Sequence, residues 1–177
     1  MRSRNCTAKW CCLVGILSLP ACRAQSAALP SVAERLERIE EMIVDYQRVF
    51  PDVVGIDAAT LRAALDAEAV VLVDVRSPEE RAISMIPDAI SRQEFEERSQ
   101  ELRGSAVVTY CTIGYRSGAY AEQLLGQGWD ARNFDGSLLA WTHAGGNLVD
   151  AEGRPTRRLH VYGQRWDLAA DGYQTVW

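Results

Sequence analysis

The chain has 177 residues, 47% of them hydrophobic, and its 19 basic against 24 acidic side chains give a net charge of −5. This length is enough for one ordinary domain with a hydrophobic core, and the composition is that of a soluble globular protein. The acidic balance argues against nucleic acid as a partner and against a polybasic membrane-binding patch.

Residues 1–22 have the pattern of a secretory signal. Three basic residues come before or at the start of an apolar run over residues 10–19, and the segment ends in Leu-Pro-Ala-Cys at residues 19–22. An apolar run of this length is too short for an ordinary membrane span and is typical of an export signal. The sequence therefore predicts a protein of the bacterial cell envelope.

The Leu-Pro-Ala-Cys end resembles a bacterial lipoprotein processing site. This predicts that Cys22 becomes the lipidated first residue, and that the periplasmic protein meets the membrane only through its lipid anchor. Two alternatives stay open. Cleavage after Ala24 would release a soluble periplasmic protein, and an uncleaved segment would act as a weak anchor.

The cysteine count leaves one thiol in the mature domain. Cys6, Cys11 and Cys12 lie in the signal segment and Cys22 would carry lipid, so Cys111 has no partner for an intrachain disulfide. In an oxidising compartment a single thiol escapes mispairing within its own chain, although it stays open to overoxidation.

Residues 23–50 are expected to form a flexible linker over 23–30 and an amphipathic helix over 31–50. Ser31 and Glu34 make an N-terminal capping pair for this helix. Its apolar residues recur at roughly helical spacing and are Val32, Leu36, Ile39, Ile43 and Val49. By default the helix packs on the domain that follows; a spacer from the membrane is the alternative.

Residues 51–150 alternate predicted strands with predicted helices. Such alternation indicates an α/β fold with a central, mostly parallel sheet and helices on both faces. The predicted strands are residues 69–75, 106–110 and 131–134. The predicted helices are residues 58–67 after the cap Asp57, a helix starting at Ser77 and Pro78, residues 91–103 with Phe95 and Leu102 inward, a helix from Ser117 to Gly126, and one after Gly136.

A candidate catalytic loop follows strand 106–110. A loop that feeds a helix N-terminus directs unpaired N–H groups and the positive end of the helix dipole towards its centre. A cysteine there, close to the cation of Arg116, has a depressed pKa. The sequence therefore predicts Cys111 as an ionised nucleophile. The substrate-binding residues expected around it are Thr112, Ile113, Gly114, Tyr115, Arg116 and Ser117.

Asp74 and Arg76 leave the end of strand 69–75 on the same side, at the edge where open α/β sheets place their sites. They are expected to support the pocket rather than to react. The default interpretation is a structural ion pair in which Arg76 reaches Glu79 or Glu80.

Three blocks of the chain resemble the rhodanese-like sulfurtransferases, in the family's order and at its usual spacing, over about residues 55–150. The blocks are Leu72-Val73-Asp74-Val75-Arg76-Ser77-Pro78-Glu79-Glu80, then Cys111-Thr112-Ile113-Gly114-Tyr115-Arg116-Ser117, then Phe134-Asp135-Gly136-Ser137-Leu138-Leu139-Ala140-Trp141 running on to Ala144-Gly145-Gly146. The family usually has a Gly-His-Ile-Pro-Gly-Ala segment, where this chain has Ser84-Met85-Ile86-Pro87-Asp88-Ala89 and lacks the histidine.

The resemblance implies a single rhodanese-like domain in which Cys111 carries a persulfide and the loop amides hold the sulfur. The expected donor is a small sulfur-containing anion such as thiosulfate, with its anionic end near Arg116. The expected acceptor is a thiol or a cyanide-like molecule, and a protein acceptor is also compatible. No cofactor is expected, and His143 and His160 are too few and too scattered for a metal site.

Two other functions stay open. Phosphatases or arsenate reductases of the same fold place five residues between cysteine and arginine, whereas Cys111 and Arg116 enclose only Thr112, Ile113, Gly114 and Tyr115. The smaller ring suits a single sulfur atom. The third interpretation is a persulfide carrier or redox-sensing module that does not turn over, which the fold alone does not exclude.

Residues 151–177 form a C-terminal extension outside the resemblance. The extension is rich in aromatic residues, with His160, Tyr162, Trp166, Tyr173 and Trp177. We expect these residues to pack the extension onto the domain; the alternative is that the extension frames the pocket mouth or binds a partner.

Overall fold

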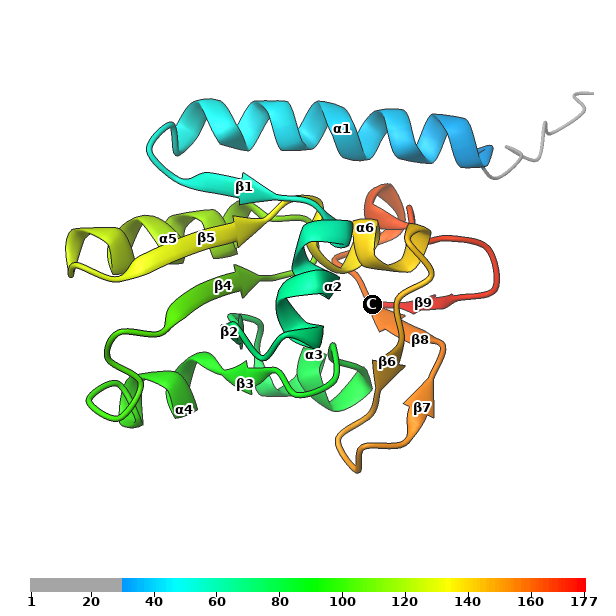
Figure 1. The fold of residues 1–177 in the computed structure, drawn as a ribbon. Coiled ribbons are helices and arrows are strands. Elements are labelled where there is room, and N and C mark those ends of the chain that lie inside the picture. The colour runs from blue at the N-terminus through cyan, green and yellow to red at the C-terminus, as the bar shows by residue number, and fades with distance from the viewer. Residues whose placement is uncertain (1–29) are drawn as a thin grey trace, which may run out of the picture.

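A five-stranded parallel sheet lies at the centre of the molecule (Figure 1). The structure is a computed structural model and describes residues 30–177. The strands are β1 (Val54–Ile56), β2 (Val70–Asp74), β3 (Ile90–Ser91), β4 (Ala106–Tyr110) and β5 (Asp130–Phe134). They are ordered β1-β5-β4-β2-β3, so the apolar β4 occupies the middle of the sheet. The predicted signal segment and Cys22 lie outside the described residues.

Helices cover both faces of the sheet, which confirms the predicted fold class. They are α1 (Val32–Val49), α2 (Ala58–Asp66), α3 (Pro78–Ile83), α4 (Arg92–Glu97), α5 (Tyr115–Gly126) and α6 (Ser137–His143). Buried residues of α1, α2 and α6 belong to one hydrophobic core, and those of α4 and α5 belong to a second. Among the described residues, no helix is both long enough and apolar enough to span a membrane.

Local capping chemistry sets the predicted helix starts. Ser31 and Glu34 form a reciprocal capping box on α1, and Ser77 and Glu80 form another on α3. Asp57 accepts the Thr60 N–H at 2.8 Å as the N-cap of α2. These predictions from the sequence are therefore confirmed.

Several boundaries differ from the prediction. The expected helix over residues 91–103 is limited to α4, because Ile90–Ser91 pairs with β2 as a strand and the polar segment after Glu97 forms turns. Helix α5 begins at Tyr115 rather than at Ser117, because Gly114 serves as its N-cap. The short edge strand β1 was not predicted.

Helix α1 packs on the domain, as the default interpretation expected. It contacts α5 and α6 and lies near the β1 edge of the sheet (Figure 1). Its buried residues are Ile39 and Tyr46, whereas Val32, Leu36 and Val49 are exposed. The apolar pattern therefore located the helix correctly but extended its inward face too far towards both ends.

The C-terminal extension also packs on the domain. Two short antiparallel strands, β6 (Leu148–Val149) and β7 (Pro155–Thr156), precede β8 (Arg158–His160), which pairs in parallel with β9 (Gln174–Val176). A 3-10 turn, η1 (Gln164–Trp166), lies between β8 and β9. Buried side chains tie the extension to the same core as α1 and α6, and these are Leu159, Val161, Leu168 and Ala169.

Candidate active site

Cys111 lies at the sharp turn between β4 and α5. Gly114 ends this turn with a φ of +123°, a backbone conformation that side chains disfavour. A Cβ atom at Gly114 would also lie 2.5 Å from Cζ of Tyr46 on α1. The turn therefore requires glycine here for two reasons, and α1 fixes the loop from outside.

The carbonyl groups of the loop point outwards to protein donors. The Cys111 carbonyl accepts the Leu138 N–H at 3.3 Å, and the Thr112 carbonyl accepts the Leu139 N–H at 3.1 Å. The Gly114 carbonyl accepts the side-chain amide of Asn133 at 3.0 Å. Because N–H and C=O point in opposite directions across a trans peptide, the N–H groups of Thr112, Ile113 and Tyr115 point away from these donors.

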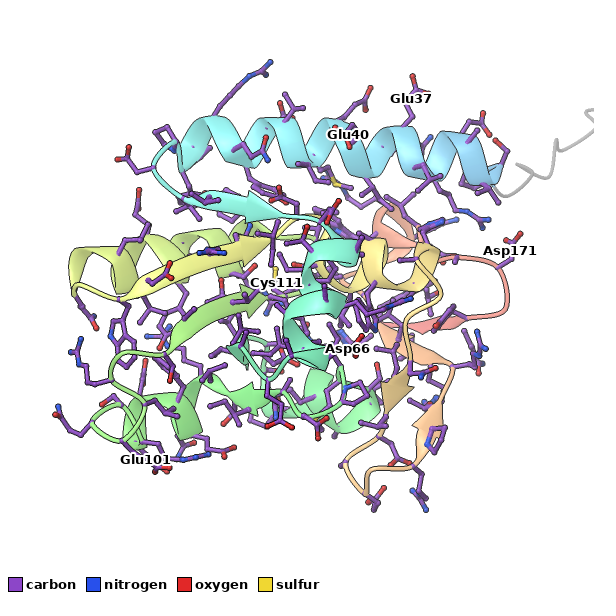
Figure 2. The ribbon with its side chains drawn as sticks, viewed as in Figure 1. Glu37, Glu40, Asp66, Glu101, Cys111 and Asp171 are labelled. Carbon is purple, nitrogen blue, oxygen red and sulfur yellow. The ribbon has the colours of Figure 1, made fainter. Side chains whose placement is uncertain are left out.

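The cysteine sulfur is buried. Cys111, which is labelled in Figure 2, is 2% exposed. The Gly114 N–H donates to Sγ at 3.1 Å. Burial raises the pKa of the thiol, but hydrogen bonds from Ser117, the charge of Arg116 and the Gly114 amide outweigh it, so the pKa of Cys111 is lowered.

Ser117 serves two parts of the loop. Its hydroxyl donates to the Gly114 carbonyl at 3.2 Å, and its side chain and backbone lie close enough to the sulfur to stabilise the thiolate. A hydroxyl has one proton, so donation to Cys111 replaces donation to Gly114.

Arg116 is held by a carboxylate that the sequence analysis did not assign to the site. Its two terminal nitrogens donate to the two oxygens of Glu80, each at 2.8 Å. Burial raises the pKa of Glu80, but this bidentate pair and the Ser77 N–H outweigh it, and the pKa is lowered. From the sequence, Glu80 was expected to cap a helix or to pair with Arg76; its actual pairing with Arg116 depends on contacts between α3 and α5.

The C-terminal extension contributes a second unpredicted contact. The ring of Tyr162 lies over the Arg116 guanidinium, with 4.7 Å between Cζ and the ring centroid. His160 Nδ1 lies 3.8 Å from the nearer Glu80 oxygen. The alternative that the extension frames the pocket mouth therefore has structural support, alongside its packing role.

Helix α1 supports the loop from the other side. The Tyr46 hydroxyl accepts the Gly136 N–H at 3.0 Å and donates to Asp135 at 3.0 Å. Burial raises the pKa of the Asp135 carboxyl. Gly136 is the N-cap of α6, whose Ser137 hydroxyl accepts the Cys111 N–H at 3.1 Å. Tyr46 thus reaches the cysteine through the start of α6.

Asp74 and Arg76 form a buried ion pair behind the loop. Two of the Arg76 nitrogens donate to the two Asp74 oxygens at 3.0 and 2.7 Å, and Tyr110 donates to Asp74 at 2.8 Å. Arg76 also donates to the Ser84 carbonyl at 2.6 Å. Arg76 does form a structural ion pair, but the predicted partner was wrong. Arg76 pairs with Asp74 rather than with Glu79 or Glu80, and Glu80 pairs with Arg116.

The predicted residues Cys111 to Ser117 therefore lie together in the turn after β4 and the first residues of α5, with Asp74 and Arg76 packed nearby. Cys22 lies outside the described residues. Within residues 30–177, no group of three or more His, Cys, Asp or Glu side chains is placed to hold a metal ion.

Comparison with known proteins gives a consistent result. The sequence pattern of the Rhodanese-like domain matches residues 57–144. A protein of Allochromatium vinosum named "Sulfurtransferase" is 38% identical over 103 residues, which make up 55% of this chain and 96% of that protein. The uncharacterized protein slr1261 of Synechocystis is 35% identical over 106 residues, which make up 58% of this chain and 59% of that protein.

A similar fold occurs in a solved structure. The crystal structure of a thiosulfate sulfurtransferase from Pseudomonas aeruginosa superposes with a TM-score of 0.52 and 23% identity. The match covers 72% of this chain and 25% of that one, and it shows a likeness of fold.

Proposed function

Because this chain belongs to the rhodanese-like sulfurtransferase family, we propose that it moves sulfane sulfur from a donor such as thiosulfate to a thiophilic acceptor through a persulfide on Cys111. The observation that carries the proposal is the Gly114 N–H, which donates to the buried Cys111 Sγ at 3.1 Å at the N-terminus of α5. A buried anion needs such donors, and a persulfide is an anion.

The proposed reaction has two balanced steps. The Cys111 thiolate attacks the outer sulfur of thiosulfate, a new S–S bond forms, and sulfite leaves with the electron pair of the bond that breaks. A thiolate or cyanide then attacks the terminal sulfur of the persulfide and takes it away, which restores the thiolate. No net proton transfer is needed in either step when the nucleophiles are ionised, and the lowered pKa of Cys111 favours that form.

Arg116 is proposed to orient an anionic donor. Glu80 and Tyr162 hold its guanidinium, and 32% of its side chain remains exposed. The exposed edge would bind the sulfonate end of thiosulfate, while Glu80 keeps the guanidinium in one orientation.

The same substitution at two cysteines tests the proposal. Cys111→Ser should abolish sulfur transfer and the mass increase of about 32 Da that one added sulfur gives after thiosulfate treatment. Cys22→Ser is the matched control and should retain both. Substantial transfer by Cys111→Ser would refute the assignment of Cys111.

A persulfide carrier or redox sensor is the second candidate. The 2% exposure of Cys111 favours it, because a covered persulfide is protected from solvent. Such a protein would take up one sulfur per chain and show no turnover with several acceptors. Continuous turnover with thiosulfate and cyanide would favour the enzyme.

We further propose that the protein is exported and lipid-anchored through Cys22. The support is the sequence pattern at residues 1–22. Cys22→Ser should remove the lipid mass from the N-terminus, as measured on the intact protein, because serine has no thiol to carry the lipid. A wild-type protein with an intact N-terminus in the cytoplasm would contradict this proposal.

A further inference from the structure

Tyr162 lies over the outer part of the active-site loop. Its ring covers one face of the Arg116 guanidinium at 4.7 Å, and the residue is 55% exposed. The ring therefore faces Arg116 on one side and solvent on another. Arg116 is held by Glu80 in the plane of the guanidinium and by Tyr162 on its face.

A second residue of the extension supports this arrangement. His160 lies 3.8 Å from Glu80 through Nδ1 and meets the Tyr162 ring edge to face, with 6.4 Å between ring centroids. Leu159 and Val161, which alternate with these two residues, are fully buried. The apolar pair thus anchors the segment, while His160 and Tyr162 face the site.

Through its contact with Arg116, Tyr162 lies at the outer end of the turn that carries the reacting sulfur. The pKa of Tyr162 is raised, mainly by burial, and the negative charges of Glu80 and Cys111 contribute while Arg116 opposes them. The four residues from Cys111 to Gly114 are buried, whereas Tyr115 is exposed and Arg116 is half-buried. A molecule that binds to the exposed part of Arg116 therefore binds beside Tyr162.

On the basis of the proposed sulfurtransferase function, we propose that Tyr162 is a positioning and size-selecting residue: it holds Arg116 over the Cys111 loop and favours small sulfur donors and acceptors over bulky ones. A small anion can reach the exposed edge of Arg116 with the ring in place. A bulky thiol requires the ring to swing away, which breaks the contact between ring and guanidinium.

Tyr162 lies outside the part of the chain that matches the family pattern, which ends at residue 144.

Access to Cys111 can be measured separately from catalysis. The full-length protein is treated with N-ethylmaleimide or with a polyethylene glycol maleimide, and the modified peptide that contains Cys111 is quantified by mass spectrometry. Both reagents react through the same chemistry, so the ratio of their rates reports size selection and is independent of the thiol's nucleophilicity.

Tyr162→Ala should raise the relative rate of the bulky reagent several-fold, and Tyr162→Leu, which keeps more side-chain volume, should raise it less. Tyr162→Phe keeps the ring and should keep the wild-type ratio. Trp177→Ala is the matched control, because Trp177 is a 64% exposed aromatic of the same extension that makes no contact with Arg116 among the described cation–π pairs. An unchanged ratio in folded Tyr162→Ala and Tyr162→Leu would overturn the proposal.

Kinetics distinguish positioning from simple packing. Loss of the ring should raise KM for thiosulfate roughly two- to fivefold, with kcat changed less, and Tyr162→Phe should restore the wild-type KM. Equal KM values in Tyr162→Ala and wild type would refute the positioning role. A wild-type protein that shows the expected labelling ratios but transfers no sulfur would overturn the proposed function and support the access role of Tyr162.

Discussion

Glu80 joins two functions in one side chain. One oxygen accepts the Ser77 N–H and caps α3, and both oxygens accept from Arg116. Since Glu80 is 4% exposed, removal of its charge would leave Arg116 without its main partner at the mouth of the site. A single carboxylate thus couples a helix start to the orientation of the cation near Cys111.

Glu80→Gln should lower the free energy of unfolding by about 1–3 kcal/mol at neutral pH, because a charged, mostly buried hydrogen-bonded pair loses its charge complement. The pKa of Glu80 is lowered in the folded protein, so its contribution is complete above the ordinary glutamate pKa of about 4.3 and is lost as the pH falls through the lower folded value. Urea unfolding across acidic pH should therefore show a weaker pH dependence in Glu80→Gln. An identical acid slope would contradict the coupling.

The thiol itself gives a second prediction at this scale. Hydrogen bonds from Ser117 contribute to the lowered pKa of Cys111. Ser117→Ala should therefore move the midpoint of the pH-dependent alkylation rate of Cys111 upwards, towards the value of an ordinary cysteine. Ser105→Ala, a change of the same type just before β4, at the end of the strand opposite to Cys111, should leave the midpoint in place. A midpoint equal to wild type in Ser117→Ala would show that Ser117 does not stabilise the thiolate.

At the scale of elements, α1 contacts the start of α5 at Gly114, where only a glycine fits. Gly114 combines a positive φ with close contact to Tyr46, and it begins α5. Tyr46 in turn accepts the N–H that starts α6. The loop that holds Cys111 therefore depends on three helices at once, including one that precedes the region matched by the family.

Gly114→Ala tests this junction against a matched position. Gly104 also has a positive φ, of 90°, but a Cβ there would meet no atom within 4 Å. Gly104→Ala should cost about 1 kcal/mol of unfolding free energy from backbone strain alone, whereas Gly114→Ala should cost clearly more and should also reduce sulfur transfer. Equal losses of unfolding free energy, measured by urea unfolding, would mean that the Tyr46 side chain moves aside for the new methyl group without an energetic penalty.

The features that could be predicted from the sequence are those determined by residues close together in the chain. The capping residues Ser31, Asp57 and Ser77 act within one helical turn, and the apolar strand β4 carries its own β-branched residues. The loop after β4 was also predictable, because strand, cysteine, glycine and arginine follow one another along the chain.

The parts that the sequence did not predict depend on contacts between distant segments. Nothing near Glu80 in the chain indicates Arg116, and Tyr46 belonged to no predicted apolar stripe although it reaches Asp135 and Gly136. Arg76 was assigned to the nearest acidic residues of α3, yet Asp74 satisfies it within the strand end. Pairing choices of this kind are decided by the three-dimensional arrangement of several donors and acceptors.

At the scale of the whole molecule, the C-terminal extension is part of the core. Leu159 is fully buried and belongs to the same cluster as Ile39 and Leu138. Leu159→Ala should therefore lower the unfolding free energy by about 2–5 kcal/mol, as expected for a large-to-small change in a core. Val54→Ala, at a residue that is 60% exposed, should change it little. Thermal unfolding with the two variants side by side would reveal whether the extension folds with the domain or separately.

The contact between Arg116 and Tyr162 has a consequence for biosynthesis. Synthesis runs from the N-terminus, so α1 and the Cys111 turn leave the ribosome before β8 and Tyr162 exist. Until that last portion arrives, Arg116 lacks the Tyr162 ring on its face, and Leu159 and Val161 are missing from the core. Completion of the chain, rather than formation of the sheet, is then the moment at which the surroundings of Arg116 become complete.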